Sequence, residues 1–568
     1  MNYWIAICGY TNESIFPEYN KENDNTYRVL ESGNVKVYYS RDGRFEHDQL
    51  YRTTHGTITV IDGVLLNLDE LKQSHSCDSI EDLIDIIGDK ERFFAEFRGP
   101  FSGFVYSSKN GSVDAFGNQT GDAPVFYFQK GSLLLVSNDC NLIVEFLKMN
   151  GFVFSLDEQA VLFLMTYGYM LNESTLLKEV KRLAPGRYLH FEKGEFKVIR
   201  YHTFSFYDND ISFEKAVDKV DQEFCKAIKR CFDKDIEYGI NEHLVDMSGG
   251  LDTRMVNFAA KKLGYDHITN ISYSQSRSDE YKYASMTSKY LRNGFIHKQL
   301  DDTLFLYEVD DLVNLNYGLT YYFGITGGRQ LLSSINNRKF GLEHTGQLGD
   351  VVVGSFSNTP NHVPPVKGSS RNSKLIAFEP SDAYYSQYAN NEDFTFENRG
   401  FRSVLSTHLT RRHYFYSVSP FIDVDFMEAC FSIPMQYRMN HKLYWAWIDK
   451  YYPDAGAIPA TRKREDKAIQ IVVHRGQRYL RKIFHKLGNR IGLFKSSSVD
   501  NHMNPFEYWY ETSKELREFI DKYYADNIIL LRPYAQTKRN VEMLYHSTRT
   551  VDKLLALSVL GGVKEYFS

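Results

Sequence analysis

Short runs of β-branched and aromatic residues, separated by glycine, asparagine, aspartate and serine, dominate the first two hundred positions of the chain. Apolar runs bounded by turn-forming residues are typical of strands joined by hairpins. Helical spacing of apolar residues is brief here, as at 80–87. The runs that predict strands are 57–62, 102–108, 123–128 and 132–137. The pattern therefore predicts a layered α+β domain over residues 1–204.

The apolar spacing changes near residue 205, where longer helical patterns begin to alternate with short apolar runs. Ser212 and Gly264 are of the residue types preferred just before and just after a helix. Alternating strands and helices imply a parallel sheet with right-handed crossovers, so residues 205–470 are predicted to form an α/β domain. The predicted elements are a helix at 212–234, a strand at 243–247, a helix at 253–263, a strand at 268–274 and a helix at 279–291.

The last hundred residues, 471–568, are mostly helical in pattern and are predicted to be a helical C-terminal extension. Within them, 474–495 is rich in arginine and lysine, and 494–505 has the composition of a loop. The basic segment has two readings, a solvated helix face or a patch for nucleic acid or membrane, and the first is favoured.

Composition narrows the class of protein. The 568 residues are 43% hydrophobic and 24% charged, which excludes a wholly disordered or fibrous chain. The formal net charge of -5 is the opposite of the bias of a nucleic-acid binder. The longest apolar run, near 161–171, is too short to span a bilayer, and the N-terminus has no signal-peptide pattern. Six cysteines without metal-site spacing suggest reduced thiols. We expect a soluble cytoplasmic protein without nucleic-acid or membrane partners.

The strongest candidate for chemistry is the heptapeptide Ser-Gly-Gly-Leu-Asp-Thr-Arg at a predicted strand-to-helix turn. Gly249 and Gly250 let the backbone fold tightly, so that several N–H groups and the positive end of the helix converge on a phosphate or pyrophosphate. Ser248 and Thr253 add hydroxyl groups. Asp252 supplies a carboxylate for a magnesium ion that bridges phosphate oxygens. The Gly-Lys-Ser/Thr ending of the P-loop is missing, so this is not a P-loop. The alternative is an ordinary turn, and the order of strand, turn, acid, hydroxyl and helix favours the phosphate loop.

This heptapeptide resembles the pyrophosphate loop of the asparagine synthetase family, whose members form acyl-adenylates. Other segments resemble the family in the same order along the chain, and together they cover about residues 1–470. In the second domain they are Asp279-Glu280, the loop 345–350, the PFID segment 420–423, Ile433-Pro434, Arg438, Lys442 and Lys463. In the first domain they are Cys8-Gly9, the segment 62–67, the segment 99–104 and the segment 121–127.

The resemblance implies an Ntn-hydrolase-like glutaminase-type domain followed by an adenine-nucleotide α-hydrolase-like domain with a parallel sheet. It also implies that ATP lies across the strand ends, held in part by Thr345 and Gly346, with magnesium on Asp252 and Asp350. A substrate carboxylate would be adenylated with release of pyrophosphate, and ammonia or an amine would then form an amide. Lysines, Lys463 first and Lys442 second, would neutralise the charge that develops.

The family default is conversion of aspartate to asparagine with glutamine as nitrogen donor. A uronic acid of a surface polysaccharide or a peptide side chain to be cyclised are the alternative acids, and a homodimer is compatible with the resemblance. A stand-alone glutaminase and a non-catalytic scaffold are the competing classes of function.

Three departures from the family bear on these roles. Gln347 replaces a glutamate, and an amide cannot take a proton as a carboxylate does. Cys8, the candidate glutaminase nucleophile, lies seven residues into the chain, so it is either a buried strand thiol or becomes exposed by removal of a propeptide. The segment 62–64 is Asp-Gly-Val where the family has Asn-Gly-Glu, and a carboxylate there repels an oxyanion. The first departure argues against ordinary asparagine synthesis, and the other two together predict a degenerate glutaminase domain.

Overall fold

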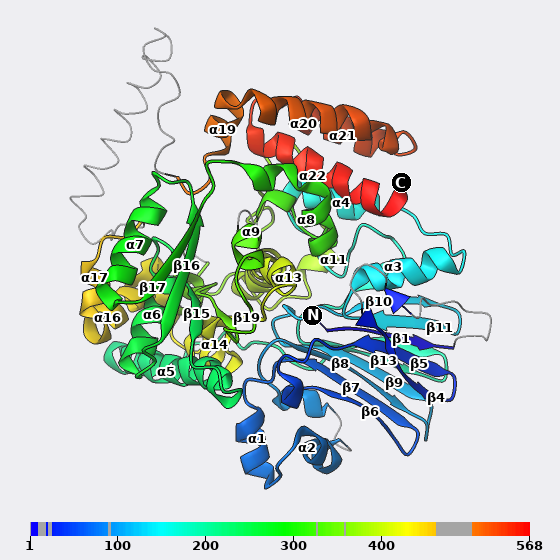
Figure 1. Cartoon of the computed structure of the whole chain (residues 1–568), viewed down its shortest axis with the longest axis horizontal. Coiled ribbons are helices and arrows are strands. Elements are labelled where there is room, and N and C mark those ends of the chain that lie inside the picture. The colour runs from blue at the N-terminus through cyan, green and yellow to red at the C-terminus, as the bar shows by residue number, and fades with distance from the viewer. Residues whose placement is uncertain are drawn as a thin grey trace.

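The computed structural model describes residues 2–9, 19–20, 25–88, 92–324, 328–356, 359–461 and 502–568, and the statements below refer to these residues. Figure 1 shows antiparallel sheets formed by the N-terminal third, a parallel sheet in the middle of the chain and helices from the C-terminal end lying across both. The protein is therefore a mixed α/β structure that contains antiparallel and parallel sheets, as the sequence predicts.

Two six-stranded antiparallel sheets form the N-terminal domain. The first has the order β12-β10-β11-β1-β5-β4, with bounds Val180–Arg182, Phe126–Lys130, Leu133–Ser137, Tyr3–Cys8, Val35–Ser40 and Arg28–Ser32. The second has the order β14-β13-β9-β8-β7-β6, with bounds Glu195–Arg200, Arg187–Glu192, Ser112–Gly117, Phe101–Ser107, Thr57–Gly63 and Leu50–Thr54. A separate ribbon pairs β2 (Tyr19–Asn20) with β3 (Asn25–Thr26).

Side-chain alternation along the strands builds four layers. On β1, Trp4 and Ala6 face the core between the two sheets, whereas Ile5 and Ile7 face the helices outside the first sheet. The outer face of the second sheet packs against α1 and α2. The helices of these two outer layers are α1 (Leu68–His75), α2 (Ile80–Ile87), α3 (Cys140–Met149) and α4 (Glu158–Tyr167). This helix–sheet–sheet–helix order is the layered glutaminase-type arrangement expected for residues 1–204.

The strand predicted at 123–128 begins later than its apolar run, because β10 starts at Phe126. Pro124 has no N–H to donate to a sheet, which accounts for the delay. The longest apolar run forms the buried helix α4 and ends at Gly168, whose φ is 85°. Among the described residues, no helix has the length and apolar character needed to cross a membrane.

The parallel sheet has the order β17-β16-β15-β18-β19, so the chain crosses from β15 to β16 and returns past β15 to β18. Its bounds are Gly294–Gln299, Ile268–Ser274, His243–Asp246, Glu343–His344 and Ser417–Val418. The helices α5 (Phe213–Glu237), α6 (Asp252–Lys262) and α7 (Asp279–Leu291) confirm the predicted ones, and Ser212 caps α5 by accepting a hydrogen bond from the Lys215 N–H. The strands β18 and β19 have two residues each and were not predicted.

The sheet is covered on both faces. One face packs against α5, α6, α14 and α16, and the other carries the apolar side chains of α9. The remaining helices of this part are α8 (Val309–Asn316), α9 (Gly328–Ser333), α10 (Gly349–Val353), α11 (Asp382–Tyr385), α12 (Asn391–Thr395), α13 (Thr407–Arg411), α14 (Val424–Phe431), α15 (Met435–Arg438), α16 (Lys442–Tyr451) and α17 (Pro453–Ala457).

The C-terminal helices share a core with the two preceding parts. They are α19 (Phe506–Thr512), α20 (Lys514–Asn527), α21 (Ala535–Tyr545) and α22 (Thr550–Phe567). Apolar residues of α22 belong to the same buried cluster as those of α3, α4 and α8. Figure 1 shows α22 running across α4 and α8 toward α3. Residues 502–568 are therefore integrated into the fold, and the basic segment 474–495 lies outside the described residues.

Candidate functional site

The phosphate-type loop lies at the carboxyl end of β15, where α6 begins. The Ser248 N–H donates to Thr253 Oγ1 (2.9 Å), and the Gly250 N–H donates to Ser248 Oγ (3.1 Å). These bonds close the loop on itself at the helix start. The Gly249 N–H donates to the carboxylate of Glu280, which stands at the start of α7. One loop amide therefore donates to a carboxylate of the protein itself.

The second predicted loop, 345–350, follows β18 and touches the first. A Cβ on Gly346 would lie 2.4 Å from the Thr253 backbone nitrogen, and one on Gly349 would lie 2.8 Å from Asp252 Cγ. Only glycine allows so close an approach at these two positions. The structure thus brings together Ser248–Thr253 with Thr345, Gly346 and the start of α10, which contains Asp350.

Tyr444, on α16, is hydrogen-bonded to the carboxylate of the first loop and lies within the electrostatic influence of the carboxylate of the second. Its hydroxyl donates to Asp252 Oδ1 (2.7 Å). Burial raises the pKa of Tyr444 well above its ordinary value, and the negative charges of Asp252 and Asp350 raise it further. Two aspartates from adjacent loops therefore lie around one hydroxyl group. Carboxylate oxygens are the ligands that Mg²⁺ prefers, so this donor set fits a magnesium ion.

The segment that leads toward Lys463 is attached to the first loop. The buried guanidinium of Arg254 donates to the carbonyl oxygens of Ile458 (2.6 Å) and Pro459 (2.8 Å). The Thr461 N–H donates to the Gly249 carbonyl oxygen (2.9 Å). Lys463 itself lies outside the described residues.

Two other predicted residues, Lys442 and Gln347, make contacts with neighbouring elements of the parallel-sheet domain. The Lys442 ammonium lies over the ring of Phe213, 4.6 Å from its centroid, which is a cation–π contact with α5. Gln347 donates through Nε2 to Thr407 Oγ1, and its buried Oε1 has no hydrogen-bond partner among the described residues. The Ser419 hydroxyl donates to the Gln347 carbonyl oxygen (3.0 Å). Gln347, within the second loop, therefore has one acceptor that no described residue occupies.

We expect Gly349→Ala to lower the rate of the reaction at this site about ten- to a hundredfold, because its Cβ would displace the Asp252 carboxylate. The measurement is steady-state turnover of the purified variant, with a thermal unfolding scan to confirm folding. Gly400→Ala is the control, since its Cβ would have an ordinary contact of 3.4 Å with Phe396. Equal activity of the two variants would contradict the contact between the loops.

Beneath the loops lies a buried ionic network that the sequence did not reveal. Arg411 Nη1 donates to Asp246 Oδ2 (2.9 Å) and to Glu343 Oε1 (2.6 Å), while Nη2 donates to the Tyr273 hydroxyl (2.7 Å). Two carboxylates thus share one guanidinium. Burial, offset in part by Arg411 and reinforced by the charge of Glu343, raises the pKa of Asp246 to about 7.

This network predicts a pH dependence of stability. The folded chain keeps a proton on Asp246 up to about pH 7. An unfolded aspartate loses it near pH 4, so the free energy of unfolding falls as the pH rises between these values. Asp246→Asn lacks this titration. From pH 5 to pH 8, its free energy of unfolding, measured by urea unfolding, should rise by about 2 kcal/mol relative to that of the wild type. A difference that stays constant with pH would contradict the assignment.

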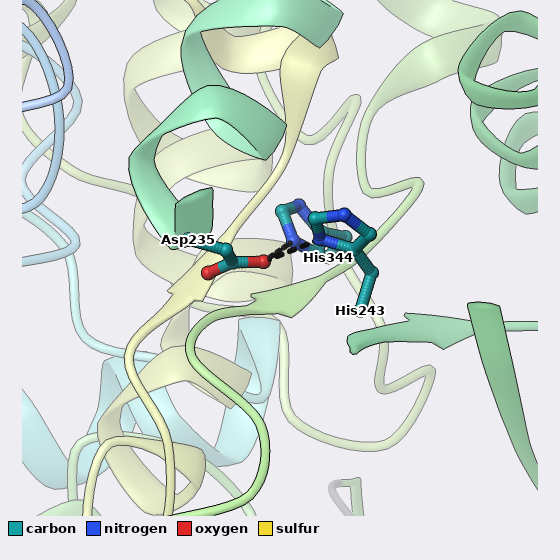
Figure 2. A group of neighbouring side chains, drawn as sticks. All are labelled: Asp235, His243 and His344. Carbon is teal, nitrogen blue, oxygen red and sulfur yellow. Dashed lines mark hydrogen bonds and ion pairs between the residues drawn. The ribbon is translucent and has the colours of Figure 1, made fainter. Parts of the chain in front are cut away.

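A second buried group lies on the opposite face of the same sheet, because the side chains of Glu343 and His344, which are neighbours on β18, alternate between the two faces. Figure 2 shows His243 and His344 on the same side of Asp235, with both rings directed at one carboxylate oxygen. His243 Nδ1 and His344 Nε2 each lie 2.8 Å from Asp235 Oδ2, and the Leu342 N–H donates to Oδ1 (2.8 Å). Burial alone would raise the pKa of Asp235, but His344 and His243 lower it below its ordinary value.

The three ligand-type atoms of this group lie within 4.8 Å of one another, which is a spacing that could hold a metal ion. The hydrogen bonds already satisfy both carboxylate oxygens of Asp235. These bonds join α5 to β15 and β18, so a structural role accounts for the group without a metal ion. Sequence spacing could not show it, because more than a hundred residues separate His344 from Asp235.

In the N-terminal domain, Asp62 at the end of β7 is contacted by Asn2 and not by Cys8. The fully buried Asn2 donates through Nδ2 to Asp62 Oδ1 (2.9 Å), and Asn138 Nδ2 donates to Asp62 Oδ2 (3.0 Å). The Tyr51 hydroxyl also donates to Asp62 (2.8 Å). Asn2 thus lies beside the segment 62–64, which the resemblance relates to the glutamine pocket, and sequence analysis did not predict this contact.

Cys8 lies at the other end of β1, roughly 20 Å along the strand at about 3.3 Å per residue. Its side chain belongs to the core between the two sheets, and the residue is 3% exposed. Burial raises the pKa of the Cys8 thiol, which disfavours the thiolate. The structure therefore does not bring Cys8 to Asp62, because strand alternation directs it into the sheet interface.

Small cavities lie between this domain and the parallel-sheet domain. One of about 30 Å³ is lined by Asp62 and Asp122 on one side and by His408 and Arg412 on the other. His408 Nδ1 lies 3.0 Å from Asp122 Oδ2. A second cavity, of about 20 Å³, also touches Asp122 and reaches Ser419. Charged and hydrogen-bonded side chains thus line the space between the two candidate sites.

The sequence model of the glutamine amidotransferase domain family matches residues 50–202. A search of curated proteins finds no match. Among solved structures, the glutamine phosphoribosylpyrophosphate amidotransferase from B. subtilis complexed with ADP and GMP is similar over 43% of this chain and 54% of that chain, with 10% identity and a TM-score of 0.22. A structure of the allosteric regulatory enzyme of purine biosynthesis is similar over 52% of this chain and 58% of that chain, with 9% identity and a TM-score of 0.23.

This chain therefore spans a little over half the length of these two structures. Their TM-scores are too low to support an argument, so the assignment depends on the family match together with the four-layer fold. The N-terminal domain is of the glutamine amidotransferase type, a class whose amide donor is glutamine.

Proposed function

We propose that this protein is an ATP-dependent amide-forming ligase that activates a carboxylic acid as its acyl-adenylate. The observation that carries the proposal is the contact between two loops at the carboxyl ends of the adjacent parallel strands β15 and β18. Each loop contributes one aspartate near the Tyr444 hydroxyl. Ligands of α/β proteins bind at this end of the sheet.

In this proposal the first loop and the N-terminus of α6 hold phosphate oxygens. Asp252 and Asp350 would hold a magnesium ion, which neutralises phosphate charge. The substrate carboxylate attacks the α-phosphorus of ATP, and the bond to pyrophosphate breaks. A nitrogen nucleophile then attacks the acyl carbon, AMP leaves and the nitrogen loses a proton. Positioning and charge neutralisation supply most of such catalysis.

The N-terminal domain is proposed to be a structural partner that no longer hydrolyses glutamine. The side-chain amide of Asn2 cannot act as a nucleophile in the way that a cysteine thiol does. The Asp62 carboxylate would repel the oxyanion of a tetrahedral intermediate. The acid is proposed to be aspartate, a uronic acid or a peptide side chain. Gln347, with its free acceptor, is the residue of the second loop that would orient the acid or the nitrogen nucleophile.

The test is pyrophosphate release from Mg-ATP with aspartate, glucuronate or an acidic peptide, in the presence of either ammonia or glutamine. Release with ammonia alone is the expected result, and Cys8→Ala should leave it unchanged. If glutamine supported release and Cys8→Ala abolished that release, the N-terminal domain would be a working glutaminase. Failure of the protein to bind Mg-ATP in equilibrium dialysis would favour the non-catalytic scaffold.

A further inference from the structure

The start of α7 lies directly against the first loop. The Gly249 N–H donates to the carboxylate of Glu280, and a Cβ on Gly249 would lie 3.0 Å from the Glu280 Cα atom. Ser278 caps α7 by accepting a hydrogen bond from the Tyr281 N–H, which fixes the backbone of this turn. Glu280 thus reaches the loop from a fixed backbone, and rotation of its side chain is enough to break the contact.

Each amide N–H of the first three loop residues already has an acceptor within the chain. The Ser248 N–H and the Gly250 N–H donate to hydroxyl oxygens, those of Thr253 and Ser248 respectively. The Gly249 N–H differs from them, because its acceptor is a carboxylate. An anion nest binds phosphate through such consecutive N–H groups. A phosphate that uses the Gly249 N–H must therefore displace Glu280.

The charge of the Glu280 carboxylate is poorly compensated in this position. The residue is half-buried, and no lysine, arginine or histidine pairs with it in the part of the chain that the structure describes. Burial raises the pKa of Glu280, the hydrogen bond from the Gly249 amide lowers it, and the negative charge of Asp279 raises it again. The carboxylate is therefore held by a backbone amide without the support of a cation.

Phosphate has the chemical advantage over this carboxylate. It offers three acceptor oxygens and more negative charge than one carboxylate does. In the proposed function a magnesium ion on Asp252 and Asp350 would neutralise part of that charge, whereas no base among the described residues neutralises Glu280. Two anions at one donor repel each other, so phosphate binding and the Glu280 contact exclude one another.

We infer that Glu280 is a built-in competitor of phosphate: the Gly249 N–H bonds either its carboxylate or a phosphate group, and each displaces the other. The inference concerns the regulation of the proposed ligase site and rests on the proposed function. No covalent bond changes in this exchange, since one hydrogen bond to the Gly249 amide replaces another. Glu280 weakens the binding of nucleotide and of pyrophosphate alike, and its return to the loop helps the product pyrophosphate to leave.

Isothermal titration calorimetry of the full-length protein with inorganic pyrophosphate, in excess magnesium, tests this exchange without catalysis. Glu280→Gln keeps the size of the side chain and an acceptor oxygen but loses the charge. A hydrogen bond to a charged acceptor exceeds one to a neutral acceptor by about tenfold in affinity. Glu280→Gln should therefore bind pyrophosphate about tenfold more tightly than the wild type. Glu280→Ala should bind it at least as tightly as Glu280→Gln.

Asp279→Asn is the matched control. It removes the same charge one residue away, from a side chain that acts on Glu280 through its charge. Its pyrophosphate affinity should change by less than about threefold, as expected for a charge at a distance in water. Equal tightening in Asp279→Asn and Glu280→Gln would overturn the inference. So would unchanged or weaker affinity in both Glu280 variants, which is the result that a purely structural brace predicts.

Kinetics separate this inference from the proposed function. Measured as AMP formation, the KM for Mg-ATP and the inhibition constant of added pyrophosphate should each fall about tenfold in Glu280→Gln. Adenylation with both constants unchanged would overturn the inference and leave the ligase intact. Tighter pyrophosphate binding by Glu280→Gln, without adenylation of any tested acid, would overturn the ligase and leave the competition for the loop. Absence of pyrophosphate binding in the wild type and in both Glu280 variants would overturn the inference.

Discussion

Asp252→Ala is expected to reduce pyrophosphate release by at least about a thousandfold, which is the scale of losing a main electrostatic group at a reacting phosphate. Asp252 stands at the start of α6 and meets the second loop at Gly349. Its removal takes away half of the proposed magnesium ligands from the chain. The measurement is pyrophosphate release at saturating Mg-ATP, with circular dichroism to confirm the fold.

Tyr444→Phe is the control for this prediction. It removes the hydroxyl that donates to Asp252 but keeps the carboxylate and the packing of α16. The expected loss is less than about tenfold, as for one hydrogen bond to a group that retains its charge. If Asp252→Ala kept more than a tenth of the wild-type rate, the metal assignment would be wrong.

Lys234→Met is expected to lower the free energy of unfolding by about 3–5 kcal/mol, the cost of leaving a buried charge unpaired. Lys234 lies on α5 and is fully buried. Its ammonium donates to Asp48 of the N-terminal domain (3.1 Å) and to Glu237 (2.5 Å). Without the lysine, Asp48 remains buried at the domain interface with no cation. Urea unfolding followed by fluorescence measures the change.

Two variants make this result interpretable. The double variant Lys234→Met with Asp48→Asn should recover part of the loss, because the uncompensated charge is removed together with its partner. Lys226→Met breaks an exposed pair with Glu223 on the same helix and should change stability by less than about 1 kcal/mol. If Lys234→Met were no more destabilising than Lys226→Met, the interface pair would not contribute to stability.

Much of the fold could be predicted from local patterns. Short apolar runs bounded by turn-forming residues predicted β7, β8 and β11, and helical spacing predicted α5, α6 and α7 close to their observed bounds. These elements are long enough for a period to be visible. The strands β18 and β19 contain two residues each, so no period exists in them. They form only because β15 offers a parallel edge to which β18 adds and β19 follows.

The candidate site divides in the same way. The loop 248–253 was visible because its glycines, hydroxyls and carboxylate are consecutive in the chain. Tyr444 was not, because it meets Asp252 across 192 positions. Cys8 was chosen by residue type, but strand alternation directs it into the core and places Asn2 at Asp62. The role of Lys463 stays a prediction.

The sequence alone determined the layered antiparallel domain, the parallel α/β domain and the phosphate-type loop, because each depends on residues near one another along the chain. Only the tertiary structure decided which groups face each other: Asp252 with Tyr444, Asp246 with Arg411, and Asn2 with Asp62. It also placed α19 and α20 next to the loops that follow β16 and β17. Such contacts join residues that are distant in sequence, and only packing of the whole core brings them together.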